Sequence, residues 1–174
     1  VVPVPHVFDV PGESTEFPVF AKPDRSQGSR GAVLVSDETE LTAALAAGSD
    51  LVMELLPGRE HTVDCFSDRD RGVLFARARA RERTRAGISM ATRTEPTSTR
   101  IEQHARAIAT RLELHGAWFF QLREDREGEP RLLEVAPRVA GTSALHRALG
   151  VNFALLALYE HLRMPVTVAP NDIE

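Results

Sequence analysis

The only lysine of the chain stands at the start of a loop rich in glycine and serine. Of the 21 basic residues, Lys22 alone is not arginine, and Gln27, Gly28, Ser29 and Gly31 follow it closely. Backbone N–H groups of small residues can approach an anion closely, and a lysine beside them can reach a phosphate oxygen. The pattern is not that of a P-loop, because the lysine precedes the glycines. It indicates phosphate binding, with a plain turn between strands as the alternative.

A second group of candidates surrounds the break in the chain at Pro57. A strand end exposes the backbone donors and acceptors that the edge of an adenine ring needs. Because Pro57 has no N–H, the amide of Leu56 is the donor available to a ring nitrogen, and the carbonyl of Glu54 can accept from the exocyclic amine. Glu60 follows closely enough to hold ribose hydroxyls. The alternative is a hairpin that carries a surface glutamate.

A third group lies on an expected hairpin whose turn is centred near Gly128. This turn brings Gln121 and Glu134 roughly opposite each other, and strand alternation then places both on one face. A carboxylate beside an amide is a hard-oxygen site that suits Mg²⁺, which leaves its other positions to phosphates and water. Arg138 follows the second strand and could meet a transferring phosphoryl group. The alternative is an edge hairpin with scattered polar residues. This alternative is weakened by the position of Glu134 in an apolar run, because a buried charge is costly without a partner.

Arginines alternate along one further stretch, at positions 77, 79, 81, 83 and 85. A period of two puts them on one face of a strand, if the strand persists that far. The face could be a cationic wall that attracts phosphates or carboxylates, or equally a solvated surface. A nucleic-acid surface is a weaker alternative, because aromatic residues do not interleave with the arginines and the net charge is −4.

Strands and helices must mix along the chain to position these candidates. Expected strands cover residues 17–22, 32–35, 51–56, 61–67, 73–85, 117–123 and 131–135. Expected helices cover residues 36–47, 100–114, 143–149 and 153–162, and residues 87–99 form an irregular stretch. The mixture predicts the α+β class, which grades into α/β.

Composition excludes several classes of protein. A chain of 174 residues forms one domain, with room for two lobes. The only cysteine, Cys65, lies in an apolar run, so it predicts a buried side chain, no disulfide framework and a cytoplasmic location. No stretch approaches the roughly 20 apolar residues of a membrane span, so no membrane partner is expected. The histidines show no metal-ligand spacing.

Taken in order, the motifs resemble those of the ATP-grasp superfamily, and most of all the ATP-binding domain of carbamoyl-phosphate-synthase-like carboxylate–amine ligases. The matching segments are FAKPDRSQGSRGAVLV (20–35), LVMELLPGREHTVDCF (51–66), RARARERTRAGIS (77–89), WFFQL (118–122), LLEVAPRVAGTSAL (132–145) and LGVNFALLAL (149–158). The resemblance implies two lobes with mostly antiparallel sheets and flanking helices. Residues 1–15 are then a leader or linker, residues 16–58 a small nucleotide-clamp lobe, and residues 59–174 a large lobe with the metal site.

The resemblance also implies a role for each candidate. Lys22 contacts a phosphate, while Gln27, Gly28, Ser29 and Gly31 belong to a loop that closes over the β- and γ-phosphates. Glu54, Leu55 and Leu56 hold adenine, and Glu60 holds the ribose. Gln121 and Glu134 are the metal ligands, and Arg138, with Lys22, stabilises the transferred group. The cofactors are ATP and Mg²⁺, with Mn²⁺ able to replace it.

The implied activity is the phosphorylation of a carboxylate by ATP, followed by displacement of phosphate by an amine. The expected partners are these small substrates and an N-terminal domain of the parent chain or a dimer partner, with acceptor specificity in residues 87–99. One departure concerns Ala136, where the family usually has a metal-binding asparagine. A nucleotide-binding module without catalysis, and an anion- or nucleic-acid-binding module, remain as alternatives.

Overall fold

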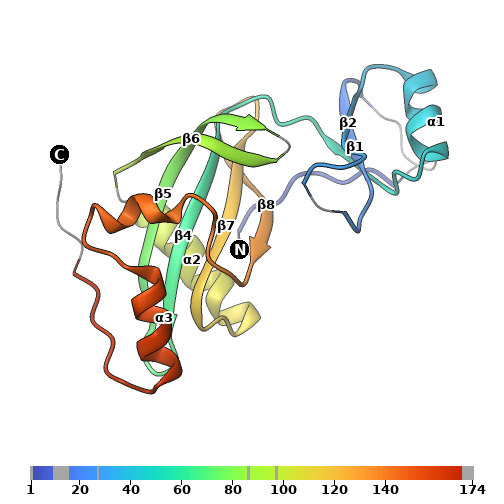
Figure 1. Cartoon of the computed structure of the whole chain (residues 1–174). Coiled ribbons are helices and arrows are strands. Elements are labelled where there is room, and N and C mark those ends of the chain that lie inside the picture. Colours follow the sequence, from blue (N-terminus) through green and yellow to red (C-terminus); the bar gives the residue numbers. More distant parts are fainter. Residues whose placement is uncertain (1, 10–15, 27, 86, 97, 170–174) are drawn as a thin grey trace.

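The computed structural model describes residues 2–9, 16–26, 28–85, 87–96 and 98–169. Its elements in chain order are β1 (Val19–Lys22), β2 (Val33–Val35), α1 (Glu38–Ala46), β3 (Leu51–Glu54), β4 (Glu60–Asp68), β5 (Gly72–Arg85), β6 (Ile88–Thr94), α2 (Thr99–Leu112), β7 (Gly116–Glu124), β8 (Pro130–Ala136), the 3₁₀ helix η1 (Ser143–Arg147) and α3 (Phe153–His161). Figure 1 shows them in two groups, β1–β3 with α1 at one end and the remaining elements around a larger sheet. The predicted α+β class is confirmed.

The smaller group is a three-stranded antiparallel sheet in the order β2-β1-β3, with α1 against it. Its core comprises apolar side chains from all four elements, namely Val19, Ala21, Val35, Leu41, Ala44 and Val52. Asp37 caps α1, because its Oδ1 accepts the N–H of Glu40 at 2.9 Å. This core fixes the direction of β1, and so the position of Lys22 at its end.

The larger group is a five-stranded sheet in the order β6-β5-β4-β7-β8, in which every neighbouring pair is antiparallel. One face packs on α2, which lies behind the sheet in Figure 1. That core contains Val63, Cys65, Trp118, Phe120 and Ile108 among others. Cys65 is buried as predicted, and burial raises the pKa of its thiol.

The opposite face of the large sheet divides into an apolar zone and a polar zone. At one end of the strands, α3 packs on the sheet in an apolar cluster that includes Phe66, Phe75, Phe153 and Leu156. At the other end the same face carries Glu60, Arg81 and Gln121, which line a cavity facing the small sheet. Strand alternation therefore keeps α2 and the polar zone on opposite sides of one sheet.

Two expectations about local structure are wrong. Residues 87–99 are not irregular, since β6 occupies Ile88–Thr94 and pairs with β5 as the edge strand of the sheet. Ile88, Thr92 and Thr94 give β6 strand propensity, but the strand is largely polar and has no buried face, so it lacks the hydrophobic alternation that predicts a strand. The arginines of β5 alternate in the sequence, but the strand that carries them is not regular to its end, because the register shifts between Arg81 and Arg83 and again before Thr84.

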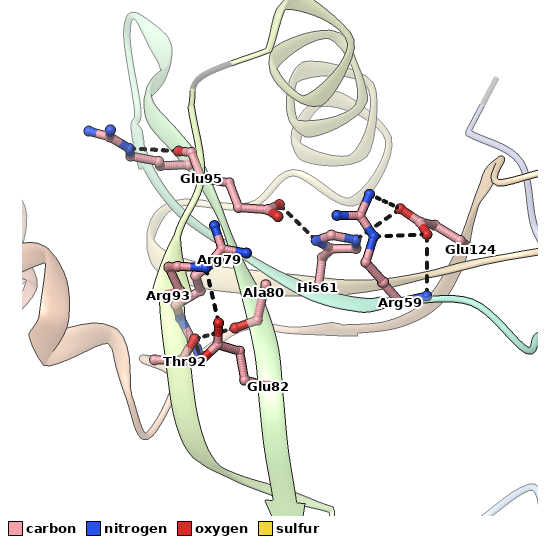
Figure 2. Close-up of polar contacts among 10 residues, drawn as sticks. Arg59, His61, Arg79, Ala80, Glu82, Thr92, Arg93, Glu95 and Glu124 are labelled. Carbon is pink, nitrogen blue, oxygen red and sulfur yellow. Dashed lines mark hydrogen bonds and ion pairs between the residues drawn. The ribbon is translucent and has the colours of Figure 1, made fainter. Parts of the chain in front are cut away.

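The connection from β3 to β4 is pinned to the end of β7. Gly58 N–H donates to the Glu124 carbonyl and Glu124 N–H donates to the Arg59 carbonyl, both at 3.0 Å. Figure 2 shows the Glu124 carboxylate between Arg59 and His61, with Glu95 on the other ring nitrogen of His61. A Cβ atom added at Gly58 would lie 2.5 Å from Glu124 Cβ, so the close approach requires glycine.

The N-terminal residues 2–9 lie against both groups of elements. Phe8 N–H donates to the Val52 carbonyl at 2.9 Å, beside a bridge between Val7 and Met53. Leu132 N–H donates to the Pro3 carbonyl at 2.8 Å. The segment therefore pairs locally with β3 of the small sheet and is tied by one backbone hydrogen bond to β8 of the large sheet. Among the described residues, no helix is long and apolar enough to cross a membrane.

Candidate active site

A cavity of about 470 Å³ lies between the small and large sheets and gathers most of the predicted site residues. The predicted residues that line it are Lys22, Gly28, Ser29, Glu54, Leu55, Leu56, Glu60, Gln121 and Glu134. Segments far apart in the sequence therefore meet in one place. Gly31 and Arg138 are not part of the lining, and Gln27 lies outside the described residues.

The phosphate-loop candidates approach the cavity from the end of β1. Lys22 is the last residue of that strand, and its backbone is fixed by an Asp50 N–H that donates to its carbonyl at 3.3 Å. Gly28 and Ser29 have φ values of 62° and 57°, in the left-handed region. Successive unusual backbone conformations of this kind turn N–H groups toward a common side, as in anion-binding nests.

Gly31 contributes to the loop in a different way. Its φ is +73°, and a Cβ atom placed on it would lie 2.9 Å from Cγ of Pro23. The residue lets the chain pass closely over Pro23 and return toward β2. The structure thus gives Gly31 a clear role in loop shape, while its predicted contact with a phosphate stays a prediction.

The adenine candidates form the apolar end of the cavity. Leu55 and Leu56 line it together with Phe20, Leu34 and Met53. These side chains form an apolar surface of the kind on which a flat ring packs. The carboxylate of Glu54 also accepts the backbone N–H of His6 at 2.9 Å, so the N-terminal segment helps to hold the end of β3.

The metal candidates face each other across the β7–β8 hairpin, as predicted from the turn. Gln121 and Glu134 are direct partners in the register, but they become so through a β-bulge. Leu122 pairs with Leu132, so Leu133 is the extra residue that shifts the register by one. Without this bulge, Gln121 would lie opposite Leu133. The bulge re-aims a side chain beside a site, a recurrent use of the device.

The expectation that Glu134 carries a buried charge is wrong. The residue is exposed, because its side chain points into the open cavity rather than toward α2. No hydrogen bond or ion pair reaches its carboxylate from the residues that the structure describes. A single carboxylate with one amide oxygen fits a Mg²⁺ ion that also takes phosphate oxygens, and does not fit a site made by protein alone. Consistently, the described residues contain no cluster of three or more His, Cys, Asp or Glu suited to a metal.

Arg81 is the central polar residue of the large-lobe side of the cavity. Its Nη1 donates to the Glu60 carboxylate and, at 3.1 Å, to Oε1 of Gln121. Its Nη2 donates to the Gly87 carbonyl at 2.5 Å. The side chain is only 4% exposed, although it lines the cavity. One arginine therefore joins the predicted ribose residue to a predicted metal ligand.

Arg138 is not among the residues that line the cavity. Its guanidinium carbon is 4.9 Å from the centre of the Phe119 ring, in a cation–π contact. Phe119 precedes Gln121 by two residues on β7, so both side chains lie on the same face of the sheet. The contact holds Arg138 against the strand that carries Gln121, and its role at the transferred group stays a prediction.

The arginine stretch of β5 is divided: Arg77, Arg79 and Arg81 are bonded within the protein, whereas the last two, at positions 83 and 85, are exposed. Arg79 is 1% exposed and donates from Nε to Oδ2 of Asp64 at 2.6 Å. Asp64 Oδ2 also contacts Nε2 of His146 at 2.9 Å, which ties η1 to the sheet. Arg77 donates from Nε to the carbonyl of Glu95 at 3.1 Å.

Sequence reasoning missed the cavity roles of Arg81, Arg123 and Gly87. Arg81 was recognised only as one of five alternating arginines, whereas the strand register shows that it lies one row from Gln121. Arg123 lies two residues after Gln121 on β7, so the same alternation that selected Gln121 could have found it. Gly87 gave no signal, because its contact with the phosphate loop joins the two lobes.

A family model covers the larger part of this chain. It is described as "ATP-grasp in the biosynthetic pathway with Ter operon", and it matches residues 48–174. The chain belongs to the ATP-grasp family. The matched range contains Glu54, Glu60, Gln121, Glu134 and the rest of the large-lobe lining. A comparison with curated protein sequences found no match.

Solved structures of ATP-grasp proteins share the fold of the chain. Biotin carboxylase from Campylobacter jejuni, solved as a β-γ-ATP complex, superposes with a TM-score of 0.79 at 18% identity over 96% of this chain and 44% of its own. N5-carboxyaminoimidazole synthetase from Staphylococcus aureus, complexed with ADP, gives 0.77 at 16% identity over 99% and 50%. L-amino acid ligase from Bacillus licheniformis gives 0.66 at 21% identity over 96% and 44%. The chain spans about half the length of these structures.

Proposed function

We propose that the chain is the ATP-binding part of a Mg²⁺-dependent ligase that joins a carboxylate to an amine and releases ADP and phosphate. The observation that carries this proposal is that one cavity between the two sheets collects the phosphate-loop, adenine, ribose and metal candidates. The solved structures of similar fold include a biotin carboxylase, an amino acid ligase and a synthetase bound to ADP, and their names support the same class of chemistry.

The nucleotide lies with its adenine on the apolar end of the cavity, beside Leu55 and Leu56. The carbonyl of Glu54 accepts from the exocyclic amine, and the amide of Leu56 donates to a ring nitrogen. Glu60 binds the ribose hydroxyls. The phosphates extend toward Lys22 and the loop of Gly28 and Ser29, where a positive charge and backbone N–H groups offset their negative charge.

In the first step, a carboxylate oxygen of the substrate attacks the γ-phosphorus, and the bond from that phosphorus to the oxygen of ADP breaks. In the second step, the amine nitrogen attacks the carbonyl carbon of the acyl phosphate, phosphate leaves, and the amine loses a proton to solvent. Lys22 and Arg138 balance the charge that moves between these oxygens. The protein contributes mainly position and electrostatic stabilisation, as phosphoryl transfer requires.

Gln121 and Glu134 are the residues that would hold Mg²⁺, with Mn²⁺ as a substitute. When bound, the ion neutralises phosphate charge and orients the oxygens that react. Since Ala136 supplies no side-chain oxygen, the protein donors of this site are one carboxylate and one amide. The carboxylate and amine substrates, an additional domain or partner that completes the cleft, and a cytoplasmic location belong to the same proposal.

The proposal is tested by calorimetric titration of the chain with ATP in the presence and absence of Mg²⁺. We expect Glu134→Gln to abolish the Mg²⁺-dependent part of binding, because the only carboxylate of the metal site is lost, while thermal unfolding stays unchanged. Glu127→Gln, on the turn of the same hairpin and outside the cavity, is the matched control. Mg²⁺ dependence in Glu134→Gln equal to that of the parent chain would contradict the metal assignment.

A turnover assay separates the ligase from a nucleotide-binding module without catalysis. ADP release that depends on both a carboxylate and an amine supports the ligase, whereas ATP binding without ADP release for any pair supports the module. The nucleic-acid alternative is disfavoured by the packing of β5, since Arg79 and Arg81 are engaged inside the protein. Salt-sensitive binding of RNA or DNA, with no effect of ATP on thermal stability, would favour that alternative.

A further inference from the structure

We propose that Arg81 is a second cation, besides Lys22, by which the cavity distinguishes nucleoside polyphosphates from the bare nucleoside. This inference rests on the proposed nucleotide site and assigns to it a cation that lies outside the phosphate loop. Arg81 is on β5 of the large lobe, and it lines the same cavity as Lys22, Gly28 and Ser29 of the small lobe. Its guanidinium binds the polyphosphate and so completes the cationic side of the site.

The geometry around Arg81 puts its guanidinium at the phosphate end of the cavity. Its Nη2 donates to the carbonyl of Gly87, in the turn between β5 and β6. Gly87 lies directly against the phosphate loop, since a Cβ added there would be 2.9 Å from Ser29 Oγ and 3.3 Å from the carbonyl carbon of Gly28. Gly87 therefore contacts both Arg81 and the loop that is expected to close over phosphates.

The bonding of Arg81 is incomplete in a way that points to a ligand. Its Nε is buried and has no hydrogen-bond partner among the described residues, although the side chain is 4% exposed. A buried N–H of a guanidinium without an acceptor is costly. Its Nη1 is shared between Glu60 and Gln121, residues that the proposal assigns to ribose and metal. A phosphate oxygen would supply an acceptor of higher charge, and a planar guanidinium can take two such oxygens at once.

The cavity lining carries as many acidic as basic residues, and the basic ones come from both lobes. Its acidic residues are Glu54, Glu60 and Glu134, and its basic residues are Lys22, Arg81 and Arg123. Lys22 and Arg81 approach the phosphate loop from opposite lobes. If Arg81 only neutralised Glu60, its loss would affect every ligand that uses the ribose site. If it binds phosphate, its loss affects ligands in proportion to their phosphate charge, which separates the two roles.

The test compares the dissociation constants of adenosine, ADP and ATP, measured calorimetrically with Mg²⁺, for the parent chain, Arg81→Ala and Arg81→Lys. We expect Arg81→Ala to weaken ATP binding about 10-fold to 100-fold, the loss typical of one or two charge-assisted hydrogen bonds. The binding of ADP should weaken less than that of ATP, and the dissociation constant of adenosine should change by less than about 3-fold. Arg81→Lys keeps the positive charge but lacks the planar guanidinium. Its affinity for ATP should therefore lie between that of the parent chain and that of Arg81→Ala.

Arg83→Ala, an exposed arginine on the same strand, is the matched control and should leave all three constants unchanged. Adenosine binding and thermal unfolding report whether each variant is folded. If Arg81→Ala does not fold, the comparison is made with Arg81→Lys. Equal weakening of adenosine, ADP and ATP, or no weakening, overturns the inference while leaving the proposed function intact. A parent chain that binds adenosine and ATP equally, or not at all, overturns both.

Discussion

Arg79 and Arg81 are two residues apart on the same strand and lie on the same face of the sheet, but they have different roles. Arg79 is covered by η1, pairs with Asp64, and has a side chain that is 2% exposed. Arg81 pairs with Glu60, whose side chain is 22% exposed, and both line the cavity. The difference arises from what lies above the sheet: His146 of η1 packs over one pair, and the cavity opens over the other.

The comparison shows why a regular pattern of charged residues in the sequence does not determine the role of each residue. A buried ion pair contributes little net stability when formed, but it becomes costly when one partner is removed. A pair at a cavity wall can exchange partners with a ligand at much lower cost, because water and ligand groups replace the contacts that are broken. Alternation in β5 supplies both arginines, and tertiary packing then divides their roles.

The largest expected effect is on folding, in Arg79→Ala. Removing this guanidinium leaves Asp64 buried with only His146 beside it, and its Oδ1 already lacks a partner among the described residues. We expect a loss of about 3–5 kcal/mol in the free energy of unfolding. Denaturant unfolding measures it, with Arg83→Ala as the control that should change stability by less than about 0.5 kcal/mol.

A double variant sharpens this prediction. Asp64→Leu with Arg79→Met replaces the charged pair by apolar side chains, so it should recover much of the loss seen in Arg79→Ala. If Arg79→Ala alone costs less than about 1 kcal/mol, the buried pair is not the sealed network described above. The contrast with Arg81 would then fail.

The next effect is on binding, in Lys22→Ala. Lys22 lines the cavity, and its ammonium donates no hydrogen bond and forms no ion pair within the described part of the chain. Its loss should therefore leave unfolding unchanged within about 0.5 kcal/mol. We expect ATP binding to weaken about 10-fold to 100-fold, since a charge-assisted contact with phosphate is lost. Calorimetry tests this, with Arg25→Ala as the exposed control, and unchanged affinity would remove Lys22 from the site.

The cavity residues were largely predictable because each belongs to a local pattern. The lysine with its glycine loop, the break at Pro57 and the hairpin around Gly128 can all be read within about 15 residues. The pairing of Gln121 with Glu134 was also expected from the turn, although the bulge at Leu133 that makes the register exact was not. Local sequence fixes which residues are candidates, and alternation fixes their face.

The missed features depend on contacts between segments distant in sequence. Nothing near Arg79 indicates that His146 will cover it, because the two are brought together only when η1 folds back on the sheet. In the same way, Gly87 meets Ser29 only when the two lobes come together. The strand β6 was missed for a related reason, since an edge strand without a buried face lacks the hydrophobic alternation by which strands are recognised.

The smallest effect concerns a third network, on the opposite face of the sheet at the junction of the lobes (Figure 2). Burial opposes ionisation of Glu124, but hydrogen bonds from Arg59 and His61 outweigh it and hold the pKa of its carboxyl below the ordinary value. A lowered pKa in the folded state stabilises the protein above the pKa of the unfolded state, and this stabilisation is lost as the pH falls through the folded pKa. Between pH 5 and pH 3, the parent chain should therefore lose more stability than Glu124→Gln, by at most about 1 kcal/mol. Urea unfolding at both pH values measures the difference, with the exposed Glu127→Gln as control.

The Glu124 network also completes the comparison of the two arginines. Because the Glu124 side chain is 18% exposed, the stability of the protein should depend on this network less than on the buried Arg79 pair and more than on the cavity pair. An identical acid loss in Glu124→Gln and the parent chain would show that the junction is held by its backbone hydrogen bonds alone.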